Sequence, residues 1–168
     1  MKMKKLFALA ATSVSTALFA EPMSVGSTAP TELIVKTDAG EQFDIGKDLQ
    51  SGMVLVYFYP KADTPGCTKQ ACSIRDAFSE LSNDGLRVYG VSMDSVEAQA
   101  AFKEKYSLPF TLIADTEGIL VDAMGVPKRG RFPARQAFLF NEGELVWRDL
   151  KASTAKQAAD VREAMAQL

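Results

Sequence analysis

The seven residues 53–59 are all apolar or aromatic, and Pro60 follows them. A strand with one face in water alternates apolar and polar residues, whereas a strand covered on both faces does not. The run therefore predicts a central strand buried on both faces of a sheet. This restricts the chain to layered folds in which other elements cover the sheet on both sides.

Two amphipathic patterns predict helices on either side of the chain's middle. Residues 68–81 carry apolar side chains at steps of three and four, which is typical of a helix with one buried face. A last helix is predicted from near Ser153, with one stripe packed on the sheet. That stripe consists of Ala158, Val161, Met165 and Leu168.

A further helix is predicted between these two. Asp94 with Glu97 three residues later resembles a capping box, and the helix should run to about Tyr106. The residues expected to face inward are Ala98, Ala101 and Phe102.

Strand patterns separate these helices. The predicted strands are 86–91, 111–114, an N-terminal hairpin of 33–35 and 43–45, and a final hairpin of 135–140 and 145–147. Strands and helices that alternate and then close with a hairpin imply a mixed central sheet with helices on both faces. We therefore expect an α/β chain with a thioredoxin-like fold.

The first twenty residues have the pattern of a secretory signal peptide. Lys2, Lys4 and Lys5 precede the uncharged residues 6–20, and an acidic residue and a proline follow. This apolar run is shorter than a membrane span. We expect cleavage after Ala20, export to a bacterial periplasm, no stable membrane association afterwards, and one domain over 21–168. An uncleaved anchor or a buried helix is the alternative.

Composition excludes several kinds of site. The chain has no His, which excludes Ser-His-Asp and Cys-His catalysis and imidazole-bound metals. Its 19 basic and 21 acidic residues give a net charge of −2, so no basic field favours nucleic acid. Two Cys are too few for a four-thiolate site. We expect no metal, no cofactor and no nucleic-acid partner.

Cys67 falls between the end of the central strand and the first turn of the next helix. Free amide N–H groups and the positive end of the helix dipole stabilise a thiolate there. A free Cys is more often a small buried hydrophobe. Because Thr64, Pro65 and Gly66 precede it, we expect an exposed, polar position and a nucleophilic sulfur.

Cys72 lies five residues further along the same predicted helix. In an ideal helix this spacing turns the two residues by about 140° and puts their Cα atoms roughly 8.7 Å apart. A disulfide needs about 4.4–6.8 Å. The two sulfurs can therefore join only if the first turns of the helix unwind, which favours a cycling disulfide over a permanent one.

These residues belong to a longer motif. Residues 57–61 lead to Thr64-Pro65-Gly66-Cys67-Thr68, and 70–72 and 75–76 follow; 90–95, 102–106, 108–110 and 135–140 come later in the same order. From Val25 to Trp147 the chain resembles the peroxiredoxins. Within them it is similar to the bacterioferritin comigratory protein or peroxiredoxin Q subgroup.

The resemblance implies a role for each residue of the motif. Cys67 is the peroxidatic cysteine, Thr64 holds the peroxide, Arg135 places a guanidinium beside the sulfur, and Pro60 shields it. Cys72 is the resolving cysteine, which forms an intramolecular disulfide with Cys67. The implied substrates are hydrogen peroxide and small organic hydroperoxides, the implied reductant is a thioredoxin-like dithiol protein, and the subgroup is frequently monomeric.

Two other functions fit an exported thioredoxin-like chain. One is thiol-disulfide exchange on protein substrates, although the usual two-residue spacing between cysteines is missing. The other is a non-catalytic binding domain with a vestigial cysteine pair. Arg135 read alone would be a surface charge at a strand end, and Thr64 a turn or cap residue.

Overall fold

A five-stranded mixed sheet forms the centre of the computed structural model, which describes residues 21–168; the predicted signal peptide lies outside them. Its strands are β3 (Met53–Phe58), β4 (Arg87–Ser92), β5 (Thr111–Ala114), β8 (Gln136–Asn141) and β9 (Glu144–Asp149). They lie in the order β5-β4-β3-β8-β9. β3 pairs in parallel with β4 and antiparallel with β8. The predicted central strand is confirmed.

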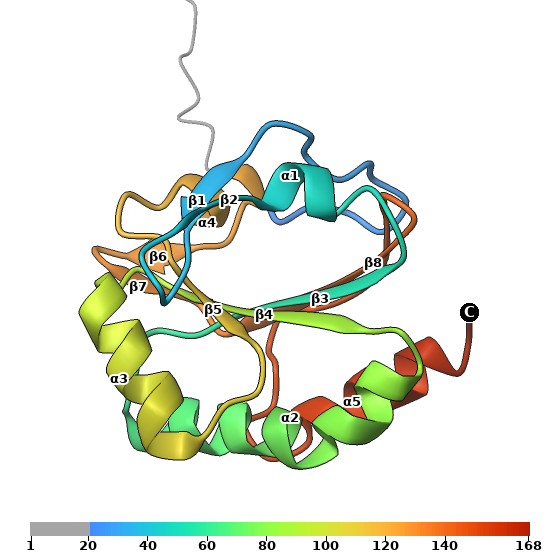
Figure 1. Cartoon of the computed structure of the whole chain (residues 1–168). Helices are drawn as coiled ribbons and strands as arrows, with labels where there is room; N and C mark the ends of the chain where they lie inside the picture. Colours follow the sequence, from blue (N-terminus) through green and yellow to red (C-terminus); the bar gives the residue numbers. More distant parts are fainter. Residues whose placement is uncertain (1–20) are drawn as a thin grey trace, which may run out of the picture.

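Helices cover both faces of the sheet (Figure 1). One face carries α2 (Pro65–Asn83), α3 (Val96–Tyr106) and α5 (Gln157–Met165). The other carries the hairpin β1 (Ile34–Lys36) and β2 (Gln42–Asp44), with α1 (Ile45–Asp48) and α4 (Ile119–Ala123). β6 (Lys128–Arg129) and β7 (Phe132–Pro133) form a separate small hairpin. The predicted N-terminal hairpin is confirmed; α1, α4 and the β6–β7 hairpin were not predicted.

β3 contributes to two hydrophobic cores, one on each face. Val54, Val56 and Phe58 pack under the N-terminal hairpin, α1 and α4. Leu55 and Tyr57 pack under the three longer helices. All five side chains are fully buried. Burial of a large apolar side chain contributes about 1.5–3 kcal/mol, so the continuous apolar run is what a doubly covered strand requires.

The start of α2 differs from the prediction by three residues. The helix begins at Pro65, and Thr64 is its N-cap with extended backbone. Proline suits the first helical position, because its fixed φ matches the helix and its missing N–H would have no partner there. The Thr-Pro-Gly segment is therefore the beginning of the helix, and Cys67 lies inside its first turn.

The predicted capping box at Asp94 is wrong by one residue. Ser95 is the N-cap of α3 and accepts a hydrogen bond from the Ala98 amide at 3.3 Å. Ala101 is exposed, and Gln99 takes a fully buried position instead. Gln99 can face inward because Tyr59 donates a hydrogen bond to its amide oxygen at 2.6 Å. A pattern of apolar residues alone does not predict that Gln99 is buried.

The last helix also differs from its prediction. α5 begins at Gln157 rather than near Ser153. Ala158 and Val161 are buried and Met165 packs against the same core, but Leu168 is 59% exposed because it lies beyond the helix end. The predicted stripe is confirmed for three of its four residues.

Candidate active site

Cys67 is the third residue of α2, just after the loop that leaves β3. The first amide groups of a helix have no carbonyl partner within it and carry the positive end of its dipole. The sulfur therefore lies where a negative charge is stabilised. Its side chain is only 2% exposed, so the expectation of an exposed position is wrong: Cys67 packs into the core under α2.

Arg135 contacts this sulfur. Its Nη2 donates to Cys67 Sγ at 3.3 Å, across 68 residues of sequence. The sheet register explains the contact, because Phe58 at the end of β3 pairs with Gln136 at the start of β8. The residue before β8 thus meets the helix that follows β3. The structure brings together two of the predicted site residues.

The charge of Arg135 is available to the sulfur. Among residues 21–168, its guanidinium forms no ion pair with a carboxylate. Tyr57 belongs to the same buried cluster as Cys67, and burial raises the pKa of Tyr57 well above its ordinary value, so this phenol stays neutral. The guanidinium is therefore free to stabilise a negative charge that develops on the Cys67 sulfur.

Gly66 permits the close approach of the guanidinium. A Cβ at this position would lie 3.2 Å from Arg135 Nη2. Such a contact is tighter than ordinary van der Waals packing, so a larger residue would displace the guanidinium or the helix start.

Gln70 is a site residue that sequence reasoning did not assign. Arg135 Nη1 donates to Gln70 Oε1, and the Gln70 side chain is fully buried. It lies three residues after Cys67, on the same face of α2. Its spacing from the cysteine and its place in the motif are the sequence signals that point to it.

Thr64 and Pro60 lie on the loop before α2. Thr64 is half-buried, and its hydroxyl donates to the Lys61 carbonyl at 2.9 Å rather than capping the helix. Because the hydroxyl proton is used in the loop, the oxygen lone pairs remain free to accept a hydrogen bond. Pro60 is also half-buried. Thr64 and Pro60 therefore lie on the loop that leads to Cys67.

Two acidic side chains hold this loop. Asp94 accepts a hydrogen bond from the Ala62 amide at 2.7 Å. Asp63, at a φ of 58°, accepts from Lys105 at 2.8 Å and from the Tyr106 hydroxyl at 2.7 Å, both at the end of α3. The Lys105 and Tyr106 hydrogen bonds lower the pKa of Asp63 below its ordinary value of 3.8.

Cys72 lies in the next turn of the same unbroken helix and is half-buried. Both cysteines are free thiols. The predicted disulfide is therefore not formed in this conformation, and the helical geometry that argues for unwinding is present.

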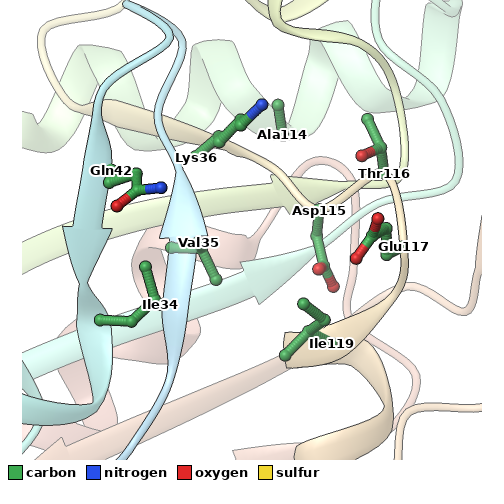
Figure 2. Close-up of a pocket in the computed structure, with 9 residues that line it drawn as sticks. All are labelled: Ile34, Val35, Lys36, Gln42, Ala114, Asp115, Thr116, Glu117 and Ile119. Carbon is green, nitrogen blue, oxygen red and sulfur yellow. The ribbon is translucent and has the colours of Figure 1, made fainter.

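A cavity of about 180 Å³ lies between β1 and the segment after β5. Figure 2 shows the side chains that line it. Lys36, Asp115 and Glu117 point toward it, and it has no cysteine in its lining. Burial raises the pKa of Asp115. No group of three or more acidic or cysteine side chains within residues 21–168 could hold a metal ion. Cys67 is thus not in this cavity.

Comparison with known proteins identifies the family. The model of the AhpC/TSA family matches residues 25–148, which contain both cysteines, Thr64, Pro60, Gln70 and Arg135. The chain belongs to the AhpC/TSA family. Peroxiredoxin bcp of Coxiella burnetii is 44% identical over 127 residues, covering 71% of this chain and 83% of that protein.

Solved structures agree. Peroxidoxin BcpB of Mycobacterium tuberculosis has a TM-score of 0.80 at 27% identity, covering 87% of this chain and 98% of that one. The bacterioferritin comigratory protein of Xanthomonas campestris has a TM-score of 0.78 at 28% identity, covering 86% and 97%. The predicted thioredoxin-like fold is confirmed, and this peroxiredoxin is a thiol-dependent peroxidase.

The Asp63 contacts predict a pH-dependent contribution to stability. Because the folded-state pKa is lowered, the contribution is complete above the unfolded value near 3.8 and is lost as pH falls through the folded value. Asp63→Asn keeps a residue that tolerates positive φ but removes the charge. The difference in unfolding free energy between wild type and variant, measured in urea, should be constant from about pH 7 to 5 and shrink below about pH 4.

Lys105→Met tests the same contact from the other side. It should reduce the low-pH loss of stability in the same range, because Lys105 is the largest cause of the shift. A difference between wild type and Asp63→Asn that does not change with pH would contradict the ionic contact.

Proposed function

We propose that Cys67 is the peroxidatic cysteine of this enzyme and that Cys72 resolves its oxidised form. The Cys67 thiolate attacks one peroxide oxygen and the O–O bond breaks, giving a sulfenic acid and a hydroxide or alkoxide that takes up a proton. The Cys72 thiolate then attacks the sulfenic sulfur, which forms the disulfide and expels hydroxide; the hydroxide takes up a proton and leaves as water. The peroxide is reduced, and the two thiols supply the electrons.

The observation that carries this proposal is the contact between Arg135 Nη2 and Cys67 Sγ at 3.3 Å. A thiolate is the reactive form of cysteine, and a neighbouring cation at a helix N-terminus stabilises it. The guanidinium has five donors in a fixed fork, so those not held by Gln70 can also reach a peroxide oxygen as charge develops on it.

Thr64 and Pro60 complete the proposed peroxide site. The Thr64 hydroxyl donates its hydrogen bond to the Lys61 carbonyl oxygen, so it can accept one from a peroxide O–H. Pro60 lies on the same loop and shields the sulfur from bulk water. Cys67 is only 2% exposed, which favours small peroxides as substrates.

The substrates that we propose are hydrogen peroxide and small organic hydroperoxides. The similar protein from Xanthomonas campestris is described for its alkyl peroxide reduction activity. That likeness supports extending the substrate range beyond hydrogen peroxide here.

The disulfide must be reduced by another molecule. The chain has two cysteines, and both are used in the cycle. We propose a thioredoxin-like protein dithiol as the reductant, acting by thiol-disulfide exchange on the exposed, unwound segment.

We also propose that the enzyme works in a bacterial periplasm as a monomer, after removal of residues 1–20 and without stable membrane association. The positively charged start and the short uncharged run support this proposal. Within residues 21–168, the helices are all too short or too polar to cross a bilayer.

Native mass spectrometry of the protein from a periplasmic extract tests the localisation proposal. We expect one copy of a chain that begins at Glu21. Recovery of the full-length chain in the cytoplasmic fraction alone, or a stable dimer, would contradict the corresponding part of the proposal.

Substitution of each cysteine tests the catalytic proposal. Cys67→Ser should lower peroxide consumption with a dithiol present by roughly 1,000-fold or more, because the nucleophile is lost. Cys72→Ser should still react once with peroxide, at about the wild-type rate in stopped flow, and leave a sulfenic acid on Cys67. That acid is identified by mass spectrometry after trapping with dimedone.

Two results would contradict the proposal. One is a Cys67→Ser variant that still consumes peroxide. The other is a wild-type protein that reduces disulfides of a test protein such as insulin but does not react with peroxide, which would support the thiol-disulfide exchange alternative.

A further inference from the structure

The last helix reaches the active site through one buried side chain. Gln157, the first residue of α5, is fully buried. Its Oε1 accepts a hydrogen bond from Gln70 Nε2 at 2.8 Å, across 87 residues of sequence. Gln70 in turn accepts from Arg135, which contacts Cys67. Three consecutive hydrogen bonds therefore connect α5 to the reactive sulfur.

The direction of these bonds gives Gln157 a defined task. A guanidinium carries donors only, so Gln70 must present its amide oxygen to Arg135. If the Gln70 amide rotated by half a turn, its NH₂ group would face the guanidinium N–H groups. By accepting from Gln70 Nε2, Gln157 holds the orientation in which the oxygen faces Arg135.

A purely structural role does not explain a glutamine at this position. The second polar atom of Gln157, Nε2, is buried and has no hydrogen-bond partner among residues 21–168. A buried unpaired donor destabilises the folded state. A methionine would fill a similar space without that donor, so the glutamine is useful only through its oxygen.

We propose that Gln157 is a positioning residue for peroxide reduction: it fixes the Gln70 amide, and through it the Arg135 guanidinium against the Cys67 sulfur. The inference rests on the proposed role of Cys67. It also implies that the arrangement exists only in the reduced, fully helical state, because Gln70 lies between Cys67 and Cys72 and moves when that segment unwinds.

Other contacts between α2 and α5 do not involve the site and serve as controls. Ser73 Oγ accepts from the Ala158 amide at 3.4 Å. Further from Cys67, an exposed ion pair joins Arg162 to Glu80. Arg162→Met therefore weakens the docking of α5 without touching Gln70.

The test measures the second-order rate of Cys67 oxidation by hydrogen peroxide, in stopped flow, for the reduced full-length protein. Gln157→Met should lower this rate about tenfold, since one hydrogen bond that orients the guanidinium is lost. Its urea stability should stay about equal, because the unpaired Gln157 donor is removed while Gln70 Nε2 loses its acceptor. Gln157→Leu, which also lacks the acceptor, should behave the same way and separates this effect from a packing effect of methionine.

A double-mutant cycle then asks whether Gln157 acts through Gln70. Gln70→Met should lower the rate by at least as much as Gln157→Met, and the double variant should be no slower than Gln70→Met alone. Arg162→Met should leave the rate unchanged. Reduction of the Cys67–Cys72 disulfide by dithiothreitol should be equally fast in wild type and Gln157→Met.

The outcomes separate this inference from the proposed function. Wild-type rates in both Gln157 variants, or independent effects of Gln70→Met and Gln157→Met, would overturn the positioning role while Cys67 remains the nucleophile. An equal slowing in Arg162→Met would also overturn it, because general docking of α5 would then be responsible. Peroxide consumption by Cys67→Ser would instead refute the proposed function itself.

Discussion

The proposed chemistry of the site depends on one contact, between the Arg135 guanidinium and the Cys67 sulfur. It requires an antiparallel register in which β8 starts where β3 ends, and a helix that begins at Pro65 rather than a turn later. A glycine at position 66 favours it, because a Cβ there would lie 3.2 Å from the guanidinium. Arg135 and Cys67 are 68 residues apart in the sequence, and the rigid, closely packed sheet holds Nη2 and Sγ 3.3 Å apart.

The same helix start has two opposing requirements in the proposed cycle. While helical, it holds Cys67 in the field of the helix dipole and of Arg135, and it keeps Cys72 too far away to form a disulfide. The attack of Cys72 on oxidised Cys67 requires the first turns of α2 to unwind. Contacts from two other helices restrain it: α3 holds the preceding loop through Asp63, and α5 holds Gln70 through Gln157. In the proposed cycle, the combined strength of these contacts opposes the unwinding that brings Cys72 to a sulfenic acid at Cys67.

Local patterns predicted most of the fold, whereas the buried polar contacts could not be predicted. A few neighbouring residues are enough to predict the apolar run of β3, the helical stripe of α2 and the terminal hairpin. Gln99, Gln70 and Gln157 read as surface residues in any such pattern, because only the folded chain supplies the partners that let an amide be buried. The early start of α2 was missed for a related reason, since Thr64, Pro65 and Gly66 favour a turn and a helix N-terminus equally. The motif located Cys67 and Arg135, but only the register shows why they meet.

Amide hydrogen exchange of the reduced and the peroxide-oxidised enzyme tests the central claim most directly, because it reports on the helix start in both states. Our account predicts that amides of residues 68–73 exchange faster once the internal disulfide has formed, while those of β3 and β4 stay protected. Cys72→Ser treated with peroxide should keep the slow exchange. A disulfide between Cys67 and Cys72, confirmed by peptide mass, with unchanged exchange over residues 68–73 would contradict the account.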